Sequence, residues 1–186
     1  PGPAMSFLDE AVMWWDHWLK KKENGVMDSP AIQAWIEESQ YPSVYKPISN
    51  GYWIGLDSWS SKTVTPDIFS LSHGLLYKGE SKTTESVILK TPQNHGLLAG
   101  EWMGAGVPGE NPADQRIDDG MAMVFESDVL NEDYEILGYP HFEVELSSDK
   151  AKAMLFAQIS DVSPDGAAAR VSYGVMNLTH LQGHDK

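Results

Sequence analysis

One helical segment followed only by short alternating segments is the strongest constraint on this fold. Strands are expected at 32–36, 68–71, 86–90, 121–126, 141–146, 153–159 and 170–178. Segment 141–146 alternates most regularly, with apolar residues at every second position. Ser163-Pro164-Asp165-Gly166 joins the last two segments and has Pro and Gly where a tight turn favours them. Short strands that do not alternate with helices favour a mostly β, antiparallel sandwich.

The helix is expected close to the N-terminus. Ser6 with Asp9 three residues later predicts its start, and Asn24-Gly25 predict its stop. Its apolar side includes Trp14, Trp15 and Trp18, and this stripe is unusually wide. Three tryptophans on one stripe need a large apolar partner. Two interpretations stay open: the stripe packs on this chain's own sheet, or it packs on another domain.

Composition excludes several classes of partner and chemistry. The chain has a net charge of -14 and a pI of about 4.6, so it repels phosphate backbones and anionic membrane surfaces. We therefore expect no nucleic-acid partner and no membrane partner. Because the chain has no cysteine, disulfides and thiolate chemistry are excluded. The histidines show no convincing metal-ligand spacing, so no metal and no cofactor are expected.

Two partial motifs resemble catalytic or nucleotide-binding signatures without their structural context. Gly79-Glu80-Ser81-Lys82-Thr83 approaches a serine-hydrolase elbow, but it ends in Thr and no helical pattern follows. The segment 104–109 spells Gly-x-Gly-x-x-Gly, yet Pro108 lies inside it and no amphipathic helix opens. We interpret the first as a surface turn and the second as a glycine-rich loop. The sequence thus predicts no catalytic residue in this chain.

Asp114, Arg116, Asp118 and Asp119 form the densest charged cluster. Three carboxylates around one guanidinium favour a structural ion-pair network, with a solvated loop and a calcium site as the alternatives. A separate group of aromatic residues would suit either sugar stacking or burial, and burial is the favoured interpretation. This group comprises Trp35, Tyr45, Tyr52, Trp53, Trp59 and Trp102.

A series of motifs resembles one enzyme family. In order, these motifs are Asp114-Gln115-Arg116, Asp118-Asp119-Gly120, Phe125-Glu126-Ser127, the segment 135–140, Ser148-Asp149, the segment 161–166 and the segment 170–180. The series resembles the C-terminal, non-catalytic region of the cocaine esterase / X-prolyl dipeptidyl peptidase / α-amino-acid ester hydrolase family. Gln158 and Leu181 stand where that family usually has arginines. Ion pairs made by those arginines are therefore not expected here.

The resemblance implies a fold, a division of the chain and a partner. It implies a jelly-roll (galactose-binding-like) antiparallel β-sandwich over 28–186, incomplete at its C-terminus. Residues 1–27 would be the terminal helix and linker of an α/β-hydrolase domain, with Trp14, Trp15 and Trp18 as interdomain packing residues. The expected partner is the catalytic domain of the same protein, a cytoplasmic serine hydrolase whose triad lies outside this chain, and a homo-oligomer is also considered. A free-standing carbohydrate-binding or assembly module is the alternative.

Overall fold

The computed structural model describes residues 5–59, 62, 64–80, 85–104 and 106–180. Its elements are α1 (Phe7–Lys20), η1 (Val26–Asp28), β1 (Ile32–Glu37), β2 (Gly51–Leu56), β3 (Phe69–Ser72), β4 (Leu75–Lys78), α2 (Arg116–Asp119), β5 (Met154–Val162), β6 (Ala168–Asn177) and η2 (Leu178–His180). The strands form small antiparallel sheets: β1 pairs with β2, β3 with β4, and β5 with β6. The described chain is therefore β-rich with few helices, as the sequence predicts.

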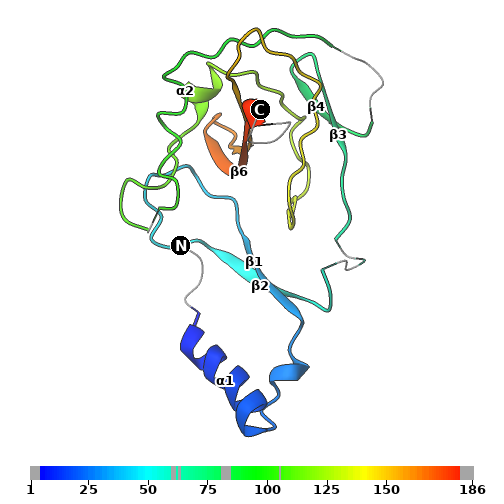
Figure 1. Ribbon diagram of the computed structural model, residues 1–186, viewed down its shortest axis with the longest axis vertical. Coiled ribbons are helices and arrows are strands. Elements are labelled where there is room, and N and C mark those ends of the chain that lie inside the picture. Colours follow the sequence, from blue (N-terminus) through cyan, green and yellow to red (C-terminus); the bar gives the residue numbers. More distant parts are fainter. Residues whose placement is uncertain (1–4, 60–61, 63, 81–84, 105, 181–186) are drawn as a thin grey trace.

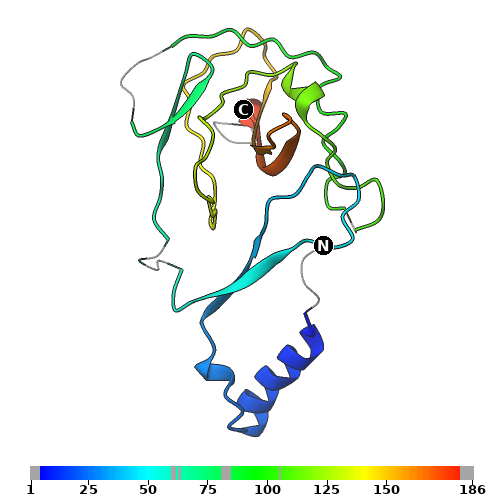
Figure 2. The same ribbon diagram turned by 180° about the vertical axis from the view of Figure 1, so that it is seen from behind.

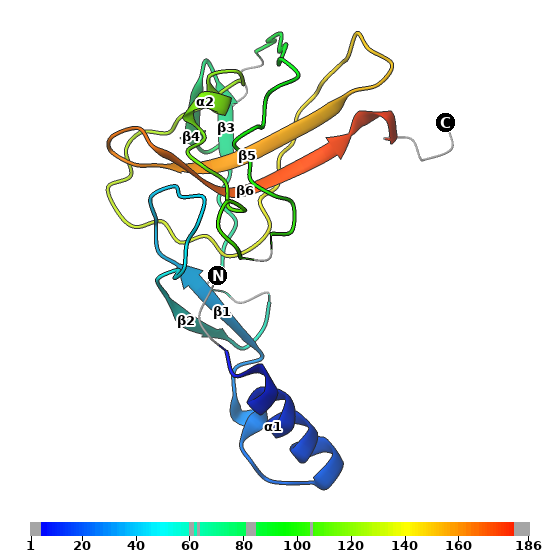
Figure 3. The same ribbon diagram turned by 90° about the vertical axis from the view of Figure 1, so that its left-hand side faces the viewer.

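The elements are arranged along one long axis. Helix α1 lies at one end, the β1–β2 hairpin follows it, and the other strands gather at the opposite end (Figure 1). The same order is visible from behind (Figure 2). From the side, β5 and β6 form a long ribbon across the upper part, well separated from α1 (Figure 3). The helix thus lies far from the longest pair of strands.

Helix α1 begins where the sequence predicts and ends earlier than predicted. Ser6 is the N-cap residue, but its hydroxyl donates to the Asp9 carboxylate and accepts nothing from the backbone. The left-handed C-cap is Lys21, at φ 59°, before Gly25 is reached. Asn24 instead donates its amide to the Met13 carbonyl at 2.7 Å. The helix therefore ends at a left-handed lysine, and Gly25, also left-handed at φ 74°, stands directly before η1.

Two strands that the sequence analysis did not single out complete the first two hairpins. Strand β2 pairs with β1 over its full length, and β4 pairs with β3. The β3–β4 turn is His73-Gly74, with φ values of 52° and 77°. Two positive φ values are characteristic of a type I′ hairpin turn, which Asn-Gly signals far better than His-Gly. The hairpin was therefore not predicted, because His-Gly is a weak sequence signal for this turn.

The β5–β6 hairpin agrees with the predicted last two strands and their turn. Gly166, at φ 85°, donates its N–H to the Ser163 carbonyl at 2.8 Å, and Ala167 donates to the Asp165 carboxylate at 3.1 Å. A register shift follows Ile159 in β5. Such a bulge bends the ribbon and redirects the side chains beside it.

Three expected strands are absent although the structure describes their residues completely. Segments 86–90 and 141–146 have no regular structure, and segment 121–126 makes only an isolated bridge, between Glu126 and Leu75. Segment 141–146 was the most regular prediction, and it was wrong. Alternation provides one apolar face, but a strand also needs a neighbour for its backbone N–H and C=O groups. No such neighbour borders this segment within the described chain.

The buried core is small. The buried hydrophobic residues of the described chain are Ile36, Leu56, Ala167, Ala168 and Ala169. The last three follow the β5–β6 turn, so the best-packed part of the molecule lies there. No helix among the described residues has the length and apolar character needed to cross a bilayer.

Candidate functional site

Helix α1 presents its tryptophans to solvent. Trp14, Trp15 and Trp18 are 46%, 56% and 43% exposed, and no residue of the helix is buried. The rings of Trp14 and Trp18 lie 5.8 Å apart, at successive turns of the same face. The structure therefore groups these predicted packing residues on one open surface, which we call the tryptophan face.

The other side of α1 is polar and internally paired. Asp16 accepts ion pairs from Lys20 at 2.5 Å and Lys22 at 2.6 Å. Hydrogen bonds from these two ammonium groups lower the pKa of Asp16. The helix is thus divided into a satisfied polar side and an uncovered aromatic side.

The charged cluster at 114–119 is only partly an ion-pair network. The guanidinium of Arg116 donates to Asp114 from Nε at 2.8 Å and from Nη2 at 2.5 Å, and Nη1 donates to the Asp165 carbonyl at 3.2 Å. Asp114 also accepts the N–H of Ala168 at 3.1 Å. The hydrogen bonds from Arg116 contribute most to lowering the pKa of Asp114 to about 2. The pair therefore connects α2 to the β5–β6 turn.

Asp118 and Asp119 turn away from that guanidinium. Asp118, 2% exposed, accepts the N–H groups of Gly96 and Leu98, each at 3.1 Å. Asp119 accepts the amide of Gln158 on β5 at 2.9 Å, and burial raises its pKa. The structure thus brings all four predicted residues into one region but gives them different partners.

Gln115 belongs to the Asp114-Gln115-Arg116 motif, but its burial was not predicted from the sequence. It is 1% exposed, and its amide donates to the carbonyls of Leu98 at 2.8 Å and Ala113 at 2.7 Å. Its backbone N–H also reaches the Ala168 carbonyl at 3.0 Å. A glutamine between charged residues gives no sequence signal of burial, because glutamines are mostly exposed.

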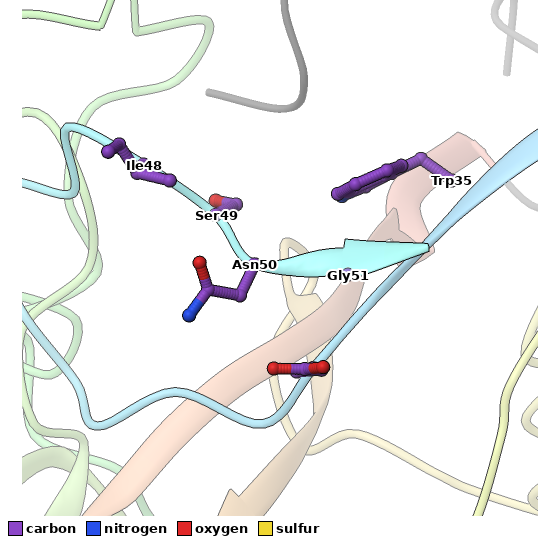
Figure 4. Close-up of a pocket in the computed structure, with 6 residues that line it drawn as sticks. Trp35, Ile48, Ser49, Asn50 and Gly51 are labelled. Carbon is purple, nitrogen blue, oxygen red and sulfur yellow. The ribbon is translucent and has the colours of Figure 1, made fainter. Parts of the chain in front are cut away.

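An open hollow of about 400 Å³ lies beside the β1–β2 hairpin. Figure 4 shows Trp35 on one side and Ile48, Ser49 and Asn50 on the segment that leads into β2. The Trp35 Nε1 atom is buried and has no hydrogen-bond acceptor among the described residues. Trp53 contacts the Trp35 ring edge-on at 5.4 Å. The hollow therefore combines an aromatic wall with polar groups.

The two partial motifs provide no site in the described residues. Gly79 and Glu80 are described, but Ser81, Lys82 and Thr83 lie outside the described residues, as do Ala105 and Leu181. In segment 104–109, Gly106 lies in a bend, Pro108 and Gly109 lie in a turn, and no helix follows directly. Within the described ranges, no group of three or more His, Asp and Glu side chains could hold a metal ion.

Comparison with protein families finds a match over most of the chain. The model of the X-Pro dipeptidyl-peptidase C-terminal non-catalytic domain matches residues 24–186. The comparison with curated proteins and the comparison with solved structures each found no match.

Proposed function

The chain belongs to the family of X-Pro dipeptidyl-peptidase C-terminal non-catalytic domains, and we propose that it docks on the α/β-hydrolase catalytic domain of the same protein. In this role it walls the substrate cleft and supports domain packing or a homo-oligomer, in the cytoplasm. The partner domain would cleave an acyl ester, an amide or an X-prolyl dipeptide by a Ser-His-Asp triad. The jelly-roll sandwich and the domain boundary at residue 27 belong to the same proposal.

The exposed tryptophan face of α1 is the observation on which this proposal depends. Trp14, Trp15 and Trp18 each keep roughly half of their surface in solvent. Burying about 100 Å² more of each ring would contribute about 2.5 kcal/mol per tryptophan before the costs of association. Tryptophan is also among the residues that dominate the binding energy of protein interfaces. The face therefore has the composition of a docking surface.

The total exposed surface supports the same conclusion. The chain exposes 15094 Å², whereas a compact folded monomer of this mass is expected to expose about 8,900 Å². Many large apolar side chains contribute to this exposed surface, and contiguous exposed apolar surface marks protein–protein interaction sites. The excess is also large enough for an obligate interface of about 2,000–5,000 Å².

A binding experiment tests the docking. The chain is titrated with the catalytic domain of an X-Pro dipeptidyl peptidase, produced without its own terminal helix because α1 would take that place, and tryptophan fluorescence is followed. We expect a blue shift on binding, and W14A/W18A should weaken binding at least about tenfold. Met13→Ala, on the opposite side of α1, is the matched control and should bind as the unchanged chain does. Equal binding by W14A/W18A and the unchanged chain would remove the tryptophan face from the proposal.

A labelling experiment tests the non-catalytic assignment. A fluorophosphonate probe, which reacts with activated serines, is incubated with the chain alone and with the reconstituted pair. We expect labelling only on the catalytic domain, because the nucleophile is supplied there. A labelled serine within these 186 residues would contradict the assignment.

The hollow beside β1–β2 favours carbohydrate binding as a second candidate function. Trp35, Asn50 and Glu38 offer a ring face, an amide and a carboxylate, which together suit a sugar. A glycan array probed with the chain tests this function, with Trp59→Ala as the control for Trp35→Ala. Array signals that survive Trp35→Ala would argue against the hollow as the site.

A further inference from the structure

The chain has two arginines, Arg116 and Arg170, and their surroundings differ sharply. Arg116 forms a two-point contact with the Asp114 carboxylate. Arg170 has neither an ion pair nor a hydrogen bond to its side chain among the described residues, although the chain has 27 acidic residues. Among the described residues, no carboxylate therefore pairs with the Arg170 guanidinium.

Arg170 is partly buried against an aromatic ring. It lies on β6, directly after the buried Ala169, and its guanidinium carbon stands 4.4 Å from the centroid of the Tyr173 ring. Desolvation by burial lowers the pKa of Arg170. Stacking covers a flat side of the guanidinium and leaves the N–H groups in its plane available. Arg170 is thus held in place with its donors unused.

Ser160 stands opposite Arg170 and also lacks a partner. The two residues are register partners at the bulge, so their side chains share one face of the ribbon. The Ser160 hydroxyl is buried, and no described residue accepts or donates a hydrogen bond to it. An unsatisfied buried hydroxyl costs about 1–3 kcal/mol. A guanidinium without an acceptor and a hydroxyl without a partner therefore lie on the same face of the ribbon.

The nearby carboxylates are occupied elsewhere. Asp119 accepts the amide of Gln158 at 2.9 Å, and Asp161 accepts the hydroxyl of Ser39. Asp119 lies on α2, and Asp161 lies on β5 itself with its carboxylate bonded to the segment that follows β1. The acceptor that Ser160 and Arg170 lack must therefore come from outside the described chain.

We propose that Arg170 and Ser160 form a carboxylate-binding site on the β5–β6 ribbon. A planar carboxylate accepts two parallel N–H bonds from a guanidinium and leaves lone pairs for a hydroxyl. A polyphosphate is disfavoured because the chain's net charge of -14 repels multiply charged anions. The exposed rings of Phe156 and Tyr173, 5.9 Å apart, border the site with apolar surface. This site does not depend on the tryptophan face, which lies at the other end of the molecule.

Nuclear magnetic resonance of the arginine side chains tests the site directly. With only two arginines, a ¹⁵N-arginine-labelled chain gives two Nε–H signals. Sodium acetate is titrated against sodium chloride of equal ionic strength. We expect a saturable shift of the Arg170 signal with a millimolar dissociation constant, and no comparable shift of Arg116, whose fork Asp114 occupies. Equal shifts of both signals, or no saturable Arg170 shift up to about 200 mM acetate, would overturn the proposal.

Two variants test the contributions of Ser160 and Arg170 to acetate binding separately. Ser160→Ala should weaken acetate binding about fivefold, the loss of one hydrogen bond, and Arg170→Lys should weaken it more because the fork is lost. Binding to the variants is followed by the backbone amides of β5 and β6. Unchanged affinity in both variants would contradict the assignment.

The source of the carboxylate is distinguished with a panel of probes. Acetate, succinate, benzoate and N-acetyl-glutamate N-methylamide are compared on the unchanged chain. Uniform millimolar binding identifies a side chain of a partner surface, whose affinity comes from the surrounding interface. A preference of at least about 100-fold for one small acid identifies a free ligand. Either result supports a carboxylate site and shows whether it binds a side chain of a partner protein or a free small acid.

Discussion

The segment around α2 and the helix α1 differ in which of their groups find partners within the chain. Around α2, buried polar groups find partners within the chain: Gln115 reaches two carbonyls and Asp118 receives two N–H groups. On α1, the polar side is paired and the three tryptophans are left in solvent. Hydrogen bonds therefore hold the segment around α2 together, whereas the tryptophan face of α1 is exposed to solvent.

This difference separates what the chain stabilises alone from what needs a partner. A satisfied buried polar network fixes one geometry because each unpaired member would be costly. An exposed aromatic face does not fix one geometry of the isolated chain. Its burial contributes free energy only when a partner covers it. Substitutions around α2 should thus lower the chain's own stability, and substitutions on α1 should lower only its docking.

The largest expected effect is that of Gln115→Ala. The substitution removes both side-chain hydrogen bonds, to the Leu98 and Ala113 carbonyls, and opens a cavity. The Leu98 carbonyl keeps the N–H of Ala113, so we expect a loss of about 3 kcal/mol in the free energy of unfolding mainly from the cavity and the Ala113 carbonyl. Urea denaturation measures it. The exposed Gln33, on β1, provides the control: Q33A should change stability by less than about 0.5 kcal/mol. Equal losses for the two variants would remove the proposed difference between the regions.

Asp118→Asn should have the next largest effect. The asparagine has the same shape but turns an NH₂ group toward one of the two N–H donors of Gly96 and Leu98. We expect a loss of about 2 kcal/mol by the same denaturation experiment. The matched control is D128N, since Asp128 is exposed. A neutral result for D118N would mean that the carboxylate charge is not required there.

The pH dependence of stability should reveal the Asp114–Arg116 pair. The pKa of Asp114 is about 2 in the folded chain, below its ordinary value of 3.8, so its contribution is present above pH 4. This contribution is lost as the pH falls from about 4 to about 2. Asp114→Asn should remove about 1–2 kcal/mol at pH 7 and flatten this part of the profile.

Asp119 provides the control of opposite sign. Burial raises the pKa of Asp119, so the folded state favours its protonated form and the associated stability is lost as the pH rises. D119N should therefore not reproduce the loss seen for D114N at pH 7. Parallel losses in both variants would show that charge pairing does not distinguish these carboxylates.

The smallest expected effect on stability is that of the tryptophan face. Because Trp14 and Trp18 are already exposed, W14A/W18A should change the free energy of unfolding by less than about 0.5 kcal/mol each. The same variant should still weaken docking strongly. A large loss of stability in the isolated chain would mean that these rings pack in the chain's own core. The tryptophan face would then not differ from the segment around α2 in its role.

Sequence patterns located some elements well and failed on others for identifiable reasons. The strands β1, β3, β5 and β6 were predicted close to their observed bounds, because local alternation and the turn at 163–166 agree there. The β3–β4 turn escaped because His73 adopts the positive φ that usually signals Asn or Gly. Segment 141–146 alternates without pairing, since pairing depends on a neighbour that no local pattern specifies.

The candidate site was anticipated in its residues more than in its contacts. The charged cluster and the three tryptophans were named from the sequence, and the family match covers residues 24–186. The burial of Gln115 and the unpaired Ser160–Arg170 couple were not anticipated. Both depend on residues between 10 and 53 positions apart being brought together, a separation over which composition gives no information.

By itself, the sequence determined that the chain is acidic and cysteine-free, that one amphipathic helix precedes a β-rich region, and which residues are charged or aromatic. These properties follow from composition and local periodicity, which any short stretch of chain displays. Only the tertiary structure decided which donors meet acceptors: Arg116 bonds to Asp114, whereas Arg170 lies opposite Ser160 and pairs with no carboxylate of the described chain. The physical reason is that hydrogen bonds and ion pairs depend on distances of a few ångströms between residues far apart in sequence.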